Sequence, residues 1–112
     1  MLAKKYRISQ KQEFDKIFKN GKKASSQNFI IRFMKNGLEN CRFSIIVSNK
    51  ISGKATERNK IKRRVKAILS NNLSNFRENI DLVIIALAPC KKLDFSSVND
   101  DMIKLLTKSK II

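Results

Sequence analysis

The sequence predicts an α+β fold, a two-layer sandwich in which helices pack on a small central sheet. Three observations predict it: segments with helical apolar spacing, segments in which apolar residues alternate, and one continuous apolar run late in the chain. The 112 residues, 42% of them hydrophobic, suffice for one core but hardly for two. We therefore expect a single domain over residues 1–112.

The first helix is expected between Ser9 and Gly21. Ser9 and Gln12 have the spacing of a capping box, and Gly21 is a natural helix stop. The apolar residues between them recur at i, i+3 and i+4, and they are Phe14, Ile17 and Phe18. This spacing predicts a helix of roughly three turns.

Two alternating segments, 29–34 and 43–48, follow and predict strands. The dipeptide Asn36-Gly37 between them favours a turn, so we expect the two strands to pair. The element order is αβββαβα if residues 29–48 hold three strands and αββαβα if they hold two. Either order gives helices packed on a small sheet.

A strongly basic helix is expected after Gly53, ending at Asn71 or Asn72. At 100° per residue, its apolar positions fall on one side; they are Ile61, Val65, Ile68, Leu69, Leu73 and Phe76. Asn59, Arg63 and Lys66 fall on the other side. A disordered basic tail has no such register, so this pattern indicates a folded element that presents cations to a polyanion.

The end of the chain predicts one more strand and one more helix. The continuous apolar run 82–88, closed by Pro89, is typical of a strand buried on both faces. Ser97 and Asp100 can cap a last helix. The residues that share its apolar face are Val98, Met102, Leu105 and Leu106.

The net charge of the chain narrows the range of expected binding partners. With 25 Lys+Arg against 9 Asp+Glu, the formal net charge is +16 and the sequence pI is about 10.3, so nucleic acid is the expected partner. The sequence has no 18-residue apolar run and no signal-peptide pattern, so we expect a cytoplasmic protein without a membrane partner. Cys41 and Cys90 lack Cys-x-x-Cys spacing, which excludes a zinc knuckle and predicts two ordinary buried thiols.

The same composition predicts no catalytic residues, no bound metal and no small-molecule substrate. The chain has no histidine, and the neighbouring carboxylates Asp100 and Asp101 would point about 100° apart on a helix. It also lacks a glycine-rich phosphate loop, because its glycines are isolated.

Two motifs give the chain a family resemblance. Arg58-Asn59-Lys60-Ile61-Lys62-Arg63-x-x-Lys66, preceded by Gly53-Lys54-Ala55, closely resembles the Arg-Asn-Arg signature of the bacterial ribonuclease P protein subunit. Tyr6-Arg7-Ile8, the segment from Glu13 to Gly21, and residues 43–48 followed by Lys50 resemble other parts of that family. Lysine replaces the family's usual arginine at Lys60 and Lys66, which keeps the charge and loses the planar fork.

The resemblance implies a protein that joins a catalytic RNA subunit to remove the 5′ leader from precursor tRNA. It implies that the RNA performs a Mg²⁺-dependent hydrolysis, that the protein itself binds no cofactor, and that the single-stranded leader binds between the first helix and the sheet. It also implies a left-handed strand-helix-strand crossover around the basic motif, against the usual right-handed rule.

The resemblance assigns candidate binding residues to two groups. Those expected to bind the RNA subunit are Arg58, Asn59, Lys60, Lys62, Arg63, Lys66 and Lys54. Those expected to bind the leader are Phe14, Phe18 and Arg32. Phe14 and Phe18 are also typical of core positions, and Arg32 lies near a position where the family often has tyrosine.

Two other classes fit the composition. A ribosomal or other structural RNA-binding protein is the main alternative, and it would not require both motifs in this order. A small DNA-binding regulator is disfavoured because the basic helix lacks the partner helix and tight turn of a helix-turn-helix module.

Overall fold

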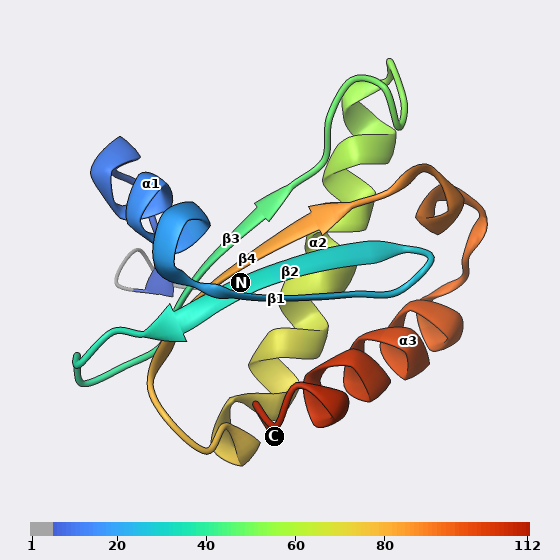
Figure 1. The fold of residues 1–112 in the computed structure, drawn as a ribbon. Coiled ribbons are helices and arrows are strands. Elements are labelled where there is room, and N and C mark those ends of the chain that lie inside the picture. The colour runs from blue at the N-terminus through green and yellow to red at the C-terminus, as the bar shows by residue number, and fades with distance from the viewer. Residues whose placement is uncertain (1–5) are drawn as a thin grey trace.

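The computed structural model describes residues 6–112, and its main elements follow the predicted order αβββαβα (Figure 1). Two short 3₁₀ helices, η2 and η3, are added to this order. The bounds are α1 Lys11–Asn20, β1 Lys22–Ser25, β2 Phe29–Lys35, β3 Arg42–Ile46, α2 Ala55–Asn72, η2 Leu73–Asn75, β4 Ile80–Ala86, η3 Ala88–Lys92 and α3 Phe95–Lys108.

The sheet has the strand order β1-β2-β4-β3. Strand β4 pairs antiparallel with β2 and parallel with β3, so the predicted pairing of the 29–34 and 43–48 segments is wrong. Six of the seven residues of β4 are buried, as predicted, and this apolar strand takes the interior position of the sheet. The loop from β2 to β3 must therefore cross about 9.5 Å, two strand spacings, which a two-residue turn cannot span.

The third strand lies outside the segment in which it was predicted. It is β1, immediately after α1, and it pairs antiparallel with β2 from Lys22↔Phe33 to Ser25↔Ile30. Three of its four residues are exposed, because β1 is an edge strand. A short polar strand has no apolar alternation, and this explains why the sequence pattern did not reveal it.

The two predicted helix caps are wrong by a few residues. The backbone N–H of Ile8 donates to the Phe43 carbonyl oxygen at 3.0 Å, which keeps the chain extended, and the capping box of α1 is formed by Gln10 and Glu13. Helix α3 begins earlier than expected because the Asp94 carboxylate accepts from the Ser97 backbone N–H at 2.8 Å. The predicted ends at Gly21 and Asn72 are confirmed.

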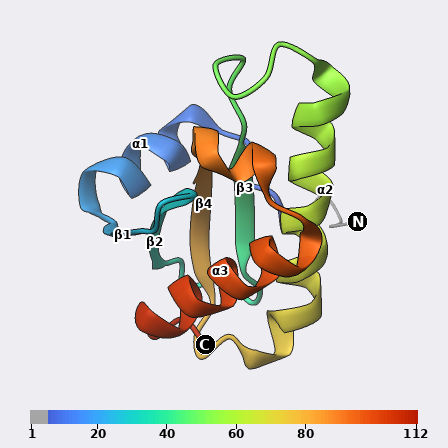
Figure 2. The ribbon, with the colours of Figure 1, turned by 90° about the vertical axis from the view of Figure 1, so that its right-hand side faces the viewer.

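Helices cover both faces of the sheet, but unequally (Figures 1 and 2). Helices α2 and α3 pack on one face and enclose the larger core, which includes Phe29, Phe43 and Met102. The opposite face carries only α1, over a small cluster of Ile8, Ile17 and Val83. The buried residues of α2 and α3 were all predicted, namely Ile61, Val65, Ile68, Leu69, Val98, Met102, Leu105 and Leu106. Leu73 and Phe76, also predicted on the apolar side of the basic helix, lie beyond its end and are half-buried against the same core.

The β3-α2-β4 connection is left-handed, as the family resemblance implies. In Figure 1 the parallel strands β3 and β4 point to the upper right, β4 lies on the lower right side of β3, and α2 lies behind the sheet. Figure 2 agrees, because it shows α1 and α2 on opposite sides of the sheet. This handedness is rare among parallel connections.

Candidate nucleic-acid interface

Helix α2 presents a basic ridge opposite its buried stripe. Asn59, Lys60 and Arg63 are exposed, whereas Ile61 and Val65, on the other side of the helix, are buried. Lys54 forms the N-cap residue and is also exposed, so its ammonium group adds to the partial positive charge of the helix N-terminus. The ridge is therefore an exposed, positively charged surface on a rigid element.

The loop before α2 is tied to the first turn of the helix. Arg58 donates from Nη1 to the Ser52 carbonyl oxygen at 2.9 Å, and the Ser52 hydroxyl donates to the Glu57 carboxylate at 2.6 Å. The Ser52 hydrogen bond, helped by the charges of Lys91 and Lys54, lowers the pKa of Glu57. One guanidinium nitrogen of Arg58 is thus used within the protein.

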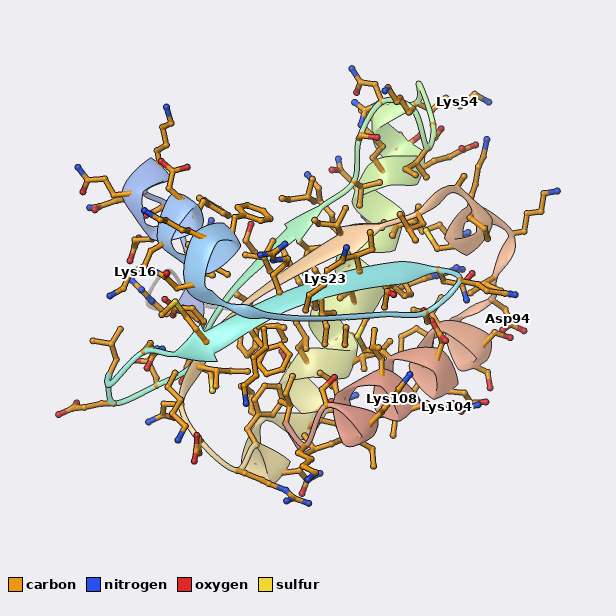
Figure 3. All side chains as sticks on the ribbon, viewed as in Figure 1. Lys16, Lys23, Lys54, Asp94, Lys104 and Lys108 are labelled. Carbon is orange, nitrogen blue, oxygen red and sulfur yellow. The ribbon has the colours of Figure 1, made fainter. Side chains whose placement is uncertain are left out.

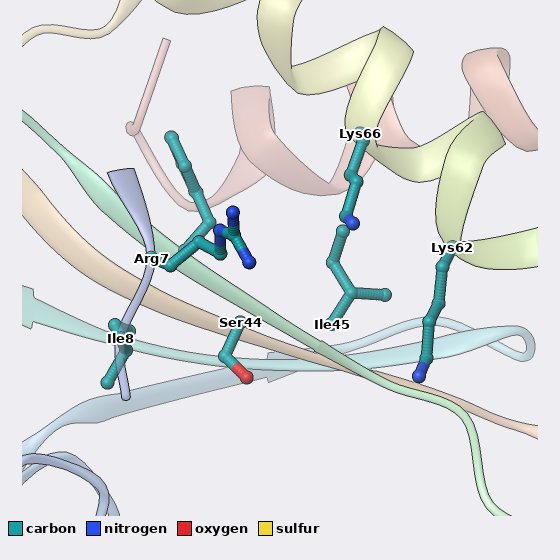
Figure 4. Close-up of a pocket in the computed structure, with 7 residues that line it drawn as sticks. Arg7, Ile8, Ser44, Ile45, Lys62 and Lys66 are labelled. Atoms are coloured by element: carbon teal, nitrogen blue, oxygen red, sulfur yellow. The ribbon is translucent and has the colours of Figure 1, made fainter. Parts of the chain in front are cut away.

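A pocket of about 170 Å³ lies between α2 and the β3 edge (Figure 4). Lys62 and Lys66 extend from α2 toward β3, and Arg7 reaches the same space from the N-terminal segment. The remaining lining residues are Ile8, Phe43, Ser44 and Ile45. With three cations and no carboxylate in its lining, this pocket suits an anionic group such as a phosphate.

A second pocket, of about 190 Å³, lies on the other side of α2, against η3. Lys60, Arg64 and Lys91 line it together with Glu57, and Arg64 donates from Nη1 to the Leu93 carbonyl oxygen at 2.8 Å. The Lys91 and Glu57 side chains are 3.5 Å apart. Because Glu57 offsets part of the positive charge of this second pocket, it is a weaker candidate for binding an anion than the first pocket.

The opposite face of the sheet has an apolar strip beside α1. Ile30, Ile85 and Ile46 stand in one cross-strand row on β2, β4 and β3. Phe18 of α1 is 38% exposed and Ile46 is 37% exposed, while Phe14 is half-buried. We call the five residues Phe14, Phe18, Ile30, Ile46 and Ile85 the apolar strip. Ile17 alone fills the buried position of α1, which leaves Phe18 accessible.

Arg32 of β2 holds the C-terminal end of α1. Its Nη2 donates to the Phe18 carbonyl oxygen, and its guanidinium carbon lies 5.4 Å from the centre of the Phe18 ring. Its Nε is buried and has no hydrogen-bond partner within residues 6–112. Arg32 therefore lies beside Phe18 of the apolar strip, and one nitrogen of its guanidinium is already hydrogen-bonded to α1.

The structure thus separates the candidate residues into two surfaces. The residues expected to bind the RNA subunit lie along α2 and its N-terminus, and Phe14, Phe18 and Arg32 lie together on the opposite face of the sheet. Sequence reasoning missed Arg7, Arg64 and Lys91 as pocket residues. Their contacts join segments far apart in the chain, and a periodicity within one helix carries no signal for such contacts.

The described part of the chain has no candidate metal centre. Within residues 6–112 there is no group of three His, Cys, Asp or Glu residues that could hold a metal ion. Cys41 and Cys90 are buried, as predicted, and burial raises the pKa of both thiols. No helix in residues 6–112 has the length and apolar character needed to cross a membrane. The net charge of +16 and the cationic pocket beside α2 instead place the chain in the class of small, strongly basic nucleic-acid-binding proteins.

Comparison with known proteins identifies the family. The family model "Ribonuclease P" matches residues 2–110. The ribonuclease P protein component of Syntrophomonas wolfei is 36% identical over 109 residues, covering 97% of this chain and 91% of the relative. That of Thermotoga maritima is 37% identical over 113 residues, covering 95% and 93%. The chain therefore belongs to the ribonuclease P protein family, as its motifs predicted.

Solved structures agree with this assignment. The Staphylococcus aureus ribonuclease P protein superposes with a TM-score of 0.88 at 28% identity, over 95% of this chain and 96% of the other. The Thermotoga maritima protein superposes with a TM-score of 0.82 at 34% identity, over 91% and 96%. The α+β fold is thus that of the family, and the chain is the protein component of an endoribonuclease holoenzyme.

Proposed function

We propose that this protein binds the catalytic RNA of ribonuclease P through α2 and holds the single-stranded 5′ leader of precursor tRNA on the apolar strip. The observation that carries the proposal is the accessibility of Phe18 and Ile46 on a sheet face that α1 covers only in part. Exposed aromatic and apolar side chains on a strongly basic protein suit unpaired nucleotides, whose bases stack and whose phosphates need cations.

The basic ridge and the first pocket are the proposed contacts to the RNA subunit. Arg63, Lys62 and Lys66 neutralise backbone phosphates in this proposal, and Arg7 joins them from the N-terminal segment. Lys54, Asn59 and Lys60 extend the contact along α2. Arg58 contributes charge while its bond to Ser52 fixes the loop before the helix.

The chemistry belongs to the RNA in this proposal. The RNA subunit uses Mg²⁺ to hydrolyse the phosphodiester bond, and the protein contributes binding of RNA and precursor without holding an ion of its own. Assembly takes place in the cytoplasm, where the precursor tRNA is the substrate. The absence of histidine from the sequence is compatible with this division of labour.

Replacing Phe18 with alanine tests the proposal directly. A stacked base contributes about 1 to 3 kcal/mol, so Phe18→Ala should lower the affinity of the reconstituted holoenzyme for leader-bearing precursor roughly 5- to 150-fold. The affinity for mature tRNA, which has no leader, should stay the same. Binding is measured with precursors of several leader lengths.

Phe95→Ala is the matched control, because Phe95 is an exposed phenylalanine of α3 on another part of the surface. It should leave both affinities unchanged. Equal losses for precursor and mature tRNA in the Phe18 variant, together with a large fall in melting temperature, would return Phe18 to a structural role and contradict the proposed leader site.

A further inference from the structure

Helix α1 is attached to the sheet by little apolar surface. Ile17 is its only buried residue, and it packs on the small cluster with Ile8 and Val83. Helix α3, in contrast, buries four residues in the larger core. Since hydrophobic stabilisation scales with the buried apolar area, polar contacts provide a large share of what fixes α1 in place.

Arg42, at the start of β3, makes the main polar contact to α1. Its Nε and Nη2 donate to the two carboxylate oxygens of Asp81 on β4, at 2.8 and 2.6 Å. Its Nη1 donates to the carboxylate of Glu13 in the first turn of α1. One guanidinium group thus joins β3, β4 and α1, and its planar geometry fixes all three directions at once.

The surroundings make these bonds rigid. Asp81 is only 5% exposed, and it also accepts from the Asn36 side-chain amide at 3.0 Å. The Glu13 and Arg42 side chains are each 21% exposed. The hydrogen bond from Arg42 to Asp81 raises the pKa of Arg42, so the group stays charged. A charge-assisted network with this little solvent access is much less screened than a surface ion pair.

Glu13 links this network to the backbone of α1. Its Oε1 accepts from the Gln10 backbone N–H at 3.2 Å in the capping box, while its Oε2 accepts from Arg42. Arg32 binds the carbonyl oxygen of Phe18 at the other end of the helix. Arg32 on β2 and Arg42 on β3, the two strands that flank β4, therefore hold α1 at both ends. Arg42 binds Glu13, next in sequence to Phe14, and Arg32 binds Phe18.

We infer that Arg42, acting through Glu13, is a positioning residue for the leader: it fixes the angle of α1 on the sheet and thereby places Phe18 beside Ile30, Ile46 and Ile85 in the apolar strip. This inference rests on the proposed leader site. Arg42 touches no nucleotide in this account. Its effect on leader binding passes through α1, so it should disappear when the aromatic side chain that it places is removed.

Glu13→Gln is the sharpest test. Glutamine can still accept from the Gln10 backbone N–H in a capping box, and the bonds between Arg42 and Asp81 remain, but the ion pair to α1 is lost. We expect the reconstituted holoenzyme to bind leader-bearing precursor about 3- to 30-fold more weakly, with mature tRNA binding unchanged. Arg42→Lys, which cannot bind both carboxylates with one planar fork, should act in the same direction.

Glu78→Gln is the matched control. It removes the same charge from an ion pair with Lys35 at 3.2 Å, but those side chains are 52% and 77% exposed, and the pair joins β2 to the segment before β4 and not to α1. Precursor affinity should not change in this variant. The melting temperature of every variant is recorded, so that a loss caused by unfolded protein is recognised by equal losses for precursor and mature tRNA.

The double variant Glu13→Gln with Phe18→Ala separates positioning from general stability. If Arg42 and Glu13 act by placing Phe18, the double variant binds precursor as Phe18→Ala does, and the two losses are not additive. Additive losses, or an unchanged precursor affinity in Glu13→Gln, would overturn the inference while leaving the leader site intact. A Phe18→Ala variant with full precursor affinity would overturn the leader site and this inference together.

Discussion

Gly21 fixes the point at which α1 ends and β1 begins. Its backbone N–H donates to the Ile17 carbonyl oxygen at 2.8 Å, and its φ of −76° is open to any residue. The need for glycine is one of space. A Cβ at this position would clash with the Ile17 carbonyl oxygen and lie 2.9 Å from the Phe33 carbonyl oxygen.

Gly21→Ala should therefore destabilise the protein. Two backbone carbonyl groups cannot move as a flexible side chain can, and overpacking of this kind costs about 1 to 3 kcal/mol, which lowers Tm by roughly 5 to 15 °C. Thermal unfolding measures it. Gly53→Ala is the control, because a Cβ there has no neighbouring atom within 4 Å. Equal Tm values for the two variants would contradict the steric account.

The sequence identified most candidate residues but not their neighbours. It left open whether Phe14 and Phe18 belong to the core, and the structure finds Phe18 accessible and Phe14 half-buried. It did not predict that Arg42 joins Glu13 and Asp81, because those three residues lie on three separate elements. Which candidate residues bind RNA or leader stays a prediction.

Among the elements, α2 was the most predictable and the sheet the least. A period of 3.6 residues reports directly which side of a helix is buried, so both faces of α2 follow from the sequence. Apolar alternation reports that a strand is buried, but it does not report which strand lies beside it. This is why β4 was predicted as a buried strand while its place between β2 and β3 was missed.

Two lysine pairs with identical spacing test whether α2 is the element that meets phosphate. Lys62 and Lys66 line the first pocket, and Lys104 and Lys108 have the same i, i+4 spacing on α3. Changing the α2 pair to glutamine should flatten the log-log salt dependence of RNA-subunit binding by about 1.4 to 1.8 units, if each lysine meets one phosphate. The matched α3 pair should leave the slope unchanged.

Binding titrations of the two double variants from low to moderate salt provide these slopes. Both variants lose two charges, so any difference between them reflects position and not net charge. Equal slopes for the two would show that the attraction is spread over the whole surface. A fall in the melting temperature of the α2 variant alone, with its slope unchanged, would show that Lys62 and Lys66 support the fold instead.

On the scale of the whole molecule, the protein is a rigid α+β frame with a large excess of positive charge. The ion pairs within residues 6–112 use Lys35, Arg42 and Lys91, which leaves most of the basic residues in this range without a carboxylate partner. Figure 3 shows lysines on α1, β1 and α3 as well as at the start of α2. Such a charge attracts RNA from many directions, and in our proposal the two surfaces on opposite faces of the sheet orient the bound RNA.

The whole chain also determines where catalysis resides. It has no histidine, and residues 6–112 contain no group of three His, Cys, Asp or Glu residues that could hold a metal ion. In our proposal, hydrolysis of the phosphodiester bond therefore belongs to the RNA subunit. We therefore expect the purified protein, freed of RNA by nuclease digestion, not to cleave precursor tRNA. Adding the cognate RNA subunit transcript with Mg²⁺ should restore cleavage at the mature 5′ end, as followed by the appearance of the leader fragment.

Two controls make this result specific. If the metal serves the RNA, as we propose, the same mixture without Mg²⁺ should be inactive. If the protein contacts the leader, the RNA subunit alone with Mg²⁺ should cleave more slowly than the holoenzyme. The advantage of the holoenzyme should be greatest for precursors whose leaders are long enough to reach the apolar strip. Specific cleavage by protein that contains no RNA would place a catalytic group within this chain and contradict the division of labour between protein and RNA.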